Sequence, residues 1–101
     1  MELKVQIQDG TARMAVKGRF DFNAHREFKT GYDALMGNAD VLEIEIDMSR
    51  IDYLDSAALG MLLMLNERAK AANKTVTLAG PKGMVAQVLD VANFGKIFKI
   101  K

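Results

Sequence analysis

The chain has 101 residues, half of them hydrophobic, which is enough for one modest core, so we expect a single domain over residues 1–101. Fourteen basic and thirteen acidic residues leave a net charge of +1 without any block of like charge, which argues against a nucleic-acid partner. The absence of cysteine excludes disulfides, cysteine-based metal sites and a thiol nucleophile.

The N-terminal part predicts a hairpin followed by a helix. Apolar and polar residues alternate over 3–8 and again over 13–17, which predicts two strands, and Asp9-Gly10 between them indicates a tight turn. Asn23 is positioned to cap a helix that ends at Gly37-Asn38. We expect one side of this helix to be apolar, with Ala24, Phe28, Tyr32, Leu35 and Met36. His25 is the only histidine and is expected on the surface, because a metal site needs more ligands.

The third strand has the clearest alternation. In residues 41–48, VLEIEIDM, the side chains of Leu42, Ile44, Ile46 and Met48 should face one way. The acids between them, Glu43, Glu45 and Asp47, should lie on a wet face and pair with lysines or arginines across strands rather than form a paired-acid catalytic site. Ser49 follows, and we place it in a loop.

The C-terminal part predicts a short strand, a helix and a small last strand. Val76 and Leu78 should point inward and Thr75 and Thr77 outward, and residues 97–100 suggest a fifth strand. Pro81 suits the first turn of a third helix, whose apolar positions are Met84, Val85, Val88 and Leu89.

Together these elements predict an α/β fold. A sheet with one apolar and one wet face differs from a doubly wound sheet, whose strands are buried on both faces. We therefore expect a two-layer domain with a mixed four- to five-stranded sheet and three helices on one face.

The second helix, over about 56–72, is unusual. Ala58, Met61, Leu62, Leu65, Ala69 and Ala72 lie on one side and can pack on the sheet. The opposite side should be polar, but its first two turns hold Ser56, Leu59, Gly60, Leu63 and Met64. Either the neighbouring helices cover these residues, or an exposed apolar patch binds a partner. For Leu59 and Leu63 both explanations stay open, whereas for Gly60 and Met64 we favour partner contact. The apolar run 57–65 is too short to cross a bilayer, so we expect a soluble cytoplasmic protein without a membrane partner.

The segment IDMSRIDYLDSAALGMLLML resembles the signature of the STAS domain of bacterial anti-sigma factor antagonists. The segments 18–21 (GRFD), 78–80 (LAG) and 94–98 (FGKIF) resemble the same family in order and spacing, so the resemblance covers essentially the whole chain. It implies a STAS-like fold and a non-enzymatic function in partner switching. In that family the unphosphorylated protein binds and sequesters an anti-sigma factor or a related regulator.

The resemblance also implies a modification site. Ser56 occupies the position of the serine that is phosphorylated in that family. The enzyme is an ATP-dependent serine kinase, often the anti-sigma factor itself, and a PP2C-type phosphatase removes the phosphoryl group. Ala57 departs from the family, which often has a second hydroxyl there. Asp21 suits a turn or cap as well as the partner contact that the family position implies. The predicted partner-binding residues are Asp21, Asp55, Ser56, Ala57, Gly60 and Met64.

The residues themselves suggest how such a switch would work. Asp55 or Ser56 is a natural N-cap, and capping by Asp55 leaves Ser56 available. A phosphoryl group at a helix start meets unpaired N–H groups and the positive end of the helix dipole, so the modified domain can stay folded. Its added charge would oppose docking at the apolar patch beside it.

Three alternatives remain. A constitutive binding scaffold would use the same helix face without modification. A phosphoaspartate receiver would use Asp47, but it needs a cluster of acids for Mg²⁺ and a doubly wound sheet, and Asp9 stands alone. A small enzyme has the least support, because no catalytic group of nucleophile, base and orienting residue can be assembled. We expect no metal and no cofactor, and no P-loop pattern is present to indicate a nucleotide.

Overall fold

The computed structural model describes all residues from 1 to 101 and contains five strands, three α-helices and two short 3-10 helices. The elements are β1 (Glu2–Gln8), β2 (Thr11–Phe20), η1 (Phe22–Ala24), α1 (His25–Met36), β3 (Glu43–Leu54), α2 (Ser56–Ala71), β4 (Thr75–Ala79), α3 (Gly83–Val91), η2 (Phe94–Lys96) and β5 (Lys99–Ile100). This order confirms the predicted alternation, including the small last strand. None of the helices combines the length and the apolar character that crossing a bilayer requires.

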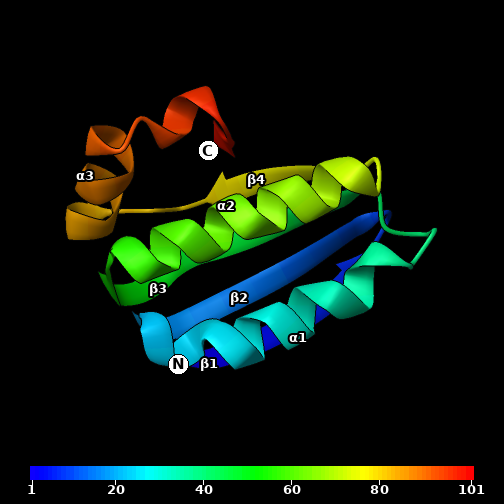
Figure 1. Cartoon of the computed structure of the whole chain (residues 1–101), viewed down its shortest axis with the longest axis horizontal. Helices are drawn as coiled ribbons and strands as arrows, with labels where there is room; N and C mark the ends of the chain where they lie inside the picture. The colour runs from blue at the N-terminus through cyan, green and yellow to red at the C-terminus, as the bar shows by residue number, and fades with distance from the viewer.

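The five strands form one mixed sheet in the order β1-β2-β3-β4-β5. β1 is antiparallel to β2, and the other neighbours are parallel. The hairpin turn is Asp9-Gly10, where both residues have positive φ, 53° and 81°, as a primed two-residue turn requires. Each parallel pair is joined by a helical crossover, and Figure 1 shows α1 and α2 side by side over the sheet, with α3 at one end. The predicted fold class is therefore confirmed.

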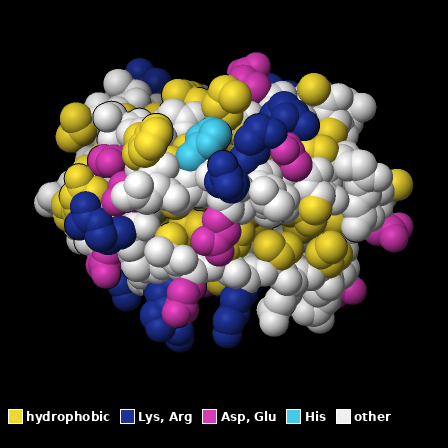
Figure 2. All heavy atoms as spheres, turned by 60° about the horizontal axis from the view of Figure 1, so that its bottom comes forward, with side chains coloured by type: hydrophobic (Ala, Val, Ile, Leu, Met, Phe, Trp, Pro, Cys, Tyr) yellow, Lys and Arg dark blue, Asp and Glu magenta, His cyan; other side chains and the backbone are white.

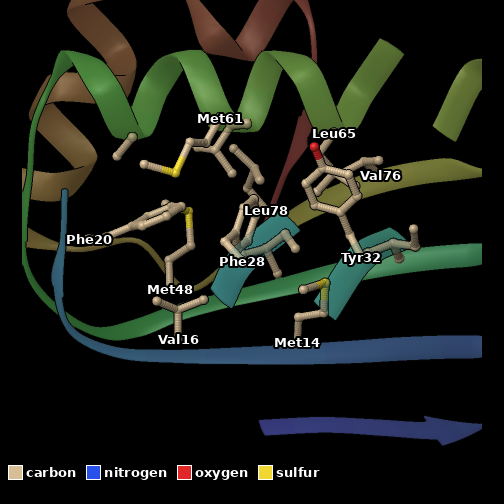
Figure 3. Close-up of a cluster of buried hydrophobic side chains, with 14 of the residues drawn as sticks. Met14, Val16, Phe20, Phe28, Tyr32, Met48, Met61, Leu65, Val76 and Leu78 are labelled. Atoms are coloured by element: carbon tan, nitrogen blue, oxygen red, sulfur yellow. The ribbon is translucent and has the colours of Figure 1, made fainter. Parts of the chain in front are cut away.

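One hydrophobic core lies between the sheet and the helices. It is a single cluster of 25 buried residues, to which all three α-helices contribute. Figure 3 shows Phe20, Phe28, Met48 and Met61 converging in this layer. The rings of Phe20 and Phe28 have centroids 4.9 Å apart, a separation typical of favourable aromatic pairs.

The third strand is longer than predicted. β3 continues through Ser49 to Leu54, so placing Ser49 in a loop was wrong. Ala15 pairs with Asp47 but Lys17 pairs with Arg50, which leaves one extra residue on β3 as a bulge. The bulge breaks the alternation in the sequence and hides the continuation of the strand. Leu42 was also placed wrongly, because it precedes β3 and is 68% exposed.

Two helices begin differently from the prediction. Asp21, rather than Asn23, caps the segment before α1, and its side chain accepts a hydrogen bond from the Asn23 N–H at 3.0 Å. α3 begins at Gly83 rather than at Pro81. The φ of Gly83 is 58°, outside the helical region, so the helix cannot extend back through Gly83 to Pro81. α2 spans Ser56–Ala71, close to the predicted range.

On the open face of the sheet two of the three acids, Glu45 and Asp47, form the predicted ion pairs, whereas Glu43 forms none. Arg13 bridges Glu45 and Asp47, and Lys101 Nζ lies 2.6 Å from Glu45 Oε1. The hydrogen bond to Glu45 and the charge of that carboxylate raise the pKa of Lys101. Thr77, expected to face outward into water, is only 3% exposed, because it lies in register between Glu45 and Lys99.

A buried lysine connects two loops at one end of the domain. Lys74 Nζ donates hydrogen bonds to the carbonyl oxygens of Asn38, at 2.9 Å, and Val41, at 2.7 Å. These bonds join the turn after α2 to the connection between α1 and β3.

Candidate partner-binding site at the start of α2

The candidate site lies where β2 and β3 end. Phe20 pairs with Leu54 at the carboxyl ends of these parallel strands, so the residues that follow, Asp21 and Asp55, come from adjacent strand ends. Figure 1 shows the start of α2, the end of β2 and α3 at the same end of the molecule. Segments that are distant in the sequence therefore meet around Ser56.

Asp55 and Ser56 have separate roles. Asp55 is the N-cap of α2, with an extended backbone (φ −119°, ψ −176°) and a side chain that accepts from the Ala58 N–H at 3.0 Å. Ser56 is the first helical residue, and its exposed hydroxyl takes part in no side-chain hydrogen bond. The N–H groups of Ser56 and Ala57 have no acceptor within the chain. The helix start is therefore capped without Ser56 and still offers free donors beside it.

The chain has a second serine, which provides an internal comparison. Ser49 is half-buried and its Oγ donates to Asp47 Oδ1 at 2.7 Å. Modification of Ser49 would break this bond, whereas modification of Ser56 would break none. Of the two serines, only Ser56 is both exposed and unpaired.

An exposed stripe runs along α2 from Ser56. It consists of Ser56, Gly60, Leu63 and Met64, which we call the α2 stripe. Met64 is 54% exposed and Leu63 is 38% exposed. A Cβ built on Gly60 meets no atom within 4 Å, so neither packing nor backbone conformation requires glycine there. The fold alone does not explain these residues.

A shallow apolar groove adjoins the α2 stripe. Leu59 is half-buried and forms one wall, and α3 forms the other with Met84, Gln87, Val88, Val91 and Ala92. The third helix therefore covers Leu59 in part, while Leu63 stays exposed. Val91 is 83% exposed, and the sequence reasoning missed it because it treated α3 only as a core helix. Ala57, predicted as a contact, is half-buried against the core.

Asp21 is engaged within the chain. One carboxylate oxygen accepts from Asn23 N–H, and the other lies 3.3 Å from Arg19 Nε. The Arg19 guanidinium is stacked over the Tyr53 ring, 3.9 Å from its centroid. Phe22, the next residue, is 73% exposed and was also missed. Phe22 belongs to η1 and lies outside α1, whose apolar side includes Phe28, and an aromatic residue in such a place is the signal that could have found it.

Asp47 does not fit the receiver alternative. It lies inside β3 rather than at its end, and the sheet begins with an antiparallel hairpin instead of a doubly wound arrangement. Burial tends to raise the pKa of Asp47, but hydrogen bonds from the Ser49 N–H and Oγ and from Arg13 outweigh it and lower the pKa. Both of its oxygens are occupied, Oδ1 by Ser49 and Oδ2 by Arg13.

Solved structures share this fold. The anti-sigma factor antagonist SpoIIAA in its unphosphorylated form superimposes with a TM-score of 0.78 at 17% identity, covering 99% of this chain and 87% of that one. An anti-sigma factor antagonist from Mycobacterium paratuberculosis superimposes with a TM-score of 0.80 at 21% identity, covering 98% and 83%. At these identities the likeness establishes the fold.

Sequence comparison establishes the family. A STAS-domain containing protein of Pseudomonas aeruginosa is 37% identical over 99 residues, which covers 98% of this chain and 87% of the relative. The family model described as "Mlab, STAS domain" matches residues 3–100. The chain, with its five-stranded mixed sheet and three helices, therefore belongs to the STAS domain family.

Proposed function

We propose that this protein is a cytoplasmic, non-enzymatic regulator that binds a partner protein through the start of α2 and releases it when Ser56 is phosphorylated. The partner class that we propose is an anti-sigma factor with serine-kinase activity or a related regulator, with a PP2C-type phosphatase reversing the modification. The observation that carries the proposal is the exposed, unbonded hydroxyl of Ser56 at a helix start that Asp55 already caps.

The structural relatives support the same class of function. SpoIIAA has been solved in an unphosphorylated and a phosphorylated form, and the present chain superimposes on the two with TM-scores of 0.78 and 0.76. A shared fold that accommodates both states is compatible with a switch that acts at the surface rather than by unfolding.

The physical effect of phosphorylation would be local. A phosphoryl group adds about −1.5 to −2 charges and can accept hydrogen bonds from the free N–H groups of Ser56 and Ala57. It would lie beside Asp55 and at one end of the α2 stripe, where a docked partner has to exclude water. A loss of about 2–5 kcal/mol at an interface corresponds to roughly thirtyfold to several thousandfold weaker binding.

A constitutive binding scaffold is the second candidate. Met64 lies eight residues after Ser56, about 12 Å along the helix axis, which exceeds the Debye length of about 8 Å at physiological salt. A partner that docks mainly on Leu63, Met64 and the adjoining groove would feel a charge at Ser56 only weakly.

Intact-mass measurement and phosphopeptide mapping of the protein from its own cells test the switch. The mapping conditions must preserve acid-labile phosphoaspartate. We expect a fraction with one phosphoryl group, lost in Ser56→Ala and retained in Ser49→Ala. Absence of phosphorylation under every growth condition would support the scaffold.

Partner binding separates the two candidates directly. Once a partner is identified with the unmodified protein, Ser56→Asp should weaken its binding at least tenfold, while Ser56→Ala should preserve it. Equal affinity for both variants would contradict the switch, and loss of binding in Met64→Lys would still locate the scaffold interface on α2.

A further inference from the structure

The outer edge of β1 is open along its whole length. β1 has seven residues and pairs with β2 in an unbroken register from Glu2 to Gln8. No backbone hydrogen bond reaches its other side. It has no proline, bulge or inward-pointing charge; of the usual devices that protect an edge strand it carries only the charges of Glu2 and Lys4, on the side away from Leu3, Val5 and Ile7. The opposite edge of the sheet is β5, which has two residues.

The helix layer covers the apolar side chains of β1 only at the start of the strand. Gly31 of α1 packs closely over Leu3, which is half-buried. Beyond this contact, Val5 is 39% exposed and Ile7 is 47% exposed, on the same side of the strand as Leu3. Figure 2, which brings the lower side of Figure 1 forward, shows hydrophobic side chains reaching the surface among charged ones there.

We propose that a second copy of this chain pairs with the β1 edge, so that two sheets join into one continuous sheet. In an antiparallel pairing about a two-fold axis at Val5, Leu3 lies opposite Ile7 of the other copy, and Val5 lies opposite Val5. Lys4 then faces Gln6 and Glu2 faces Gln8, so no like charges are directly opposed. This register matches apolar with apolar side chains and uses all seven residues of the strand.

The helices next to the edge permit this approach. On α1, Lys29 and Asp33 lie toward α2, where Asp33 contacts Arg68. Gly31, which packs over Leu3, has no side chain, and Ala34, three residues later, is exposed and small, so this side of α1 leaves room above the joined strands.

The pairing closes on itself and leaves the site around Ser56 free. A two-fold contact consumes the open edge of both copies, and β5 is too short to continue the sheet. The start of α2 follows β3, which is separated from β1 by β2. The inference is therefore independent of the proposed function.

Sedimentation equilibrium from low micromolar to near-millimolar concentration tests the proposal. The mass should rise from 11.2 kDa toward twice that value. Val5→Lys should weaken association at least tenfold, because it places two lysines opposite each other at the axis. Its circular dichroism should stay native, since Val5 is partly exposed. Met64→Lys, on the α2 stripe, should dimerise like the wild type. A wild type that stays monomeric, or a Val5→Lys variant that dimerises equally well, would overturn the proposal.

Disulfide cross-linking tests the register, because the chain has no cysteine of its own. Directly opposed residues in antiparallel strands have Cα atoms about 4.5–5.5 Å apart, within the range of a disulfide. Val5→Cys should therefore form a covalent dimer on mild oxidation. Ile7→Cys should form a covalent dimer only when it is mixed with, or combined with, Leu3→Cys, because residue 7 lies opposite residue 3 of the other copy. Efficient cross-linking by Ile7→Cys alone would refute the register.

Discussion

The two halves of α2 pack on the same core but present different surfaces to water. In the second half the exposed side carries Glu67, Arg68 and Lys70, and Arg68 Nη2 lies 3.1 Å from Asp33 of α1. In the first half it carries the α2 stripe, without a charged residue. Both halves bury their inner side equally well, so the apolar surface of the first half adds nothing that folding requires. The proposed partner site would account for this difference, because a surface that excludes water on docking is usually free of unpaired charges.

The largest predicted effect concerns the inner side of the first half. Leu62 is 0% exposed, so Leu62→Ala should lower the free energy of unfolding by about 2–5 kcal/mol through lost burial and a cavity. Met64→Ala, on the exposed side, should change it by no more than about 0.5 kcal/mol. Urea denaturation of both variants measures this. Similar losses in both would mean that the α2 stripe serves the fold after all.

The second prediction separates the cap from the modification site. Asp55→Ala removes the side-chain acceptor of the Ala58 N–H and should cost about 1 kcal/mol in thermal or urea unfolding. Ser56→Ala should cost less than about 0.5 kcal/mol, because the hydroxyl makes no hydrogen bond. If Ser56→Ala were the more damaging of the two, Ser56 would be a structural cap.

The third prediction concerns glycine on an exposed helix surface. Gly60→Ala should raise the free energy of unfolding by about 0.5–1 kcal/mol, since alanine favours the helix and its Cβ meets open space. Gly31→Ala is the matched control on α1. Its Cβ would lie 2.7 Å from Leu3 Cδ2, so something must shift and the gain should be smaller. A Gly60→Ala variant that is more stable but binds its partner less well would place Gly60 in the interface.

The smallest predicted effect tests the charged second half. The pKa of Asp33 is lowered, mainly by the hydrogen bond from Lys29. Desolvation by partial burial tends to raise this pKa, whereas the charge of Arg68 lowers it further. A carboxyl whose pKa is lower in the folded state stabilises the protein above the unfolded pKa, about 3.9, and loses this contribution as the pH falls through the folded pKa. The free energy of unfolding of the wild type should therefore be slightly larger than that of Asp33→Asn at pH 7. This difference should disappear as the pH falls through the folded pKa of Asp33. A margin that is independent of pH would exclude the ion pairs as its source.

Most of the fold could be predicted from the sequence because periodicity and turn residues are local signals. The alternation of β3, the Asp9-Gly10 turn and the apolar side of α2 all led to correct elements. The bulge after Asp47 was hidden, because a bulge depends on pairing with β2, which no local pattern records. The exposure of Val5 and Ile7 was hidden as well. Alternation shows which side of a strand is apolar, but only the position of α1 decides how much of that side is covered.

The geometry around the candidate site was predictable at the start of α2 and less so in the segments beside it. The segment 55–64 could be recognised as atypical because a helix exposed on one side should have charges there. Whether Leu59 or Leu63 was covered depended on α3, and the sequence did not place α3 against α2. Asp21 was ambiguous for a similar reason, since its bond to Arg19 requires the chain to turn at the end of β2. The roles of Ser56, Gly60 and Met64 in binding stay predictions.

Chemical labelling of the buried Lys74 can measure local opening of the native protein. Its Nζ is enclosed and donates to two carbonyl oxygens from the connection between α1 and β3. An acylating reagent can reach this amine only when that end of the domain separates, whereas the exposed Lys70 on the preceding turn is always accessible. The ratio of the two labelling rates, read by mass spectrometry, would therefore measure how often the end of the domain opposite Ser56 opens under native conditions.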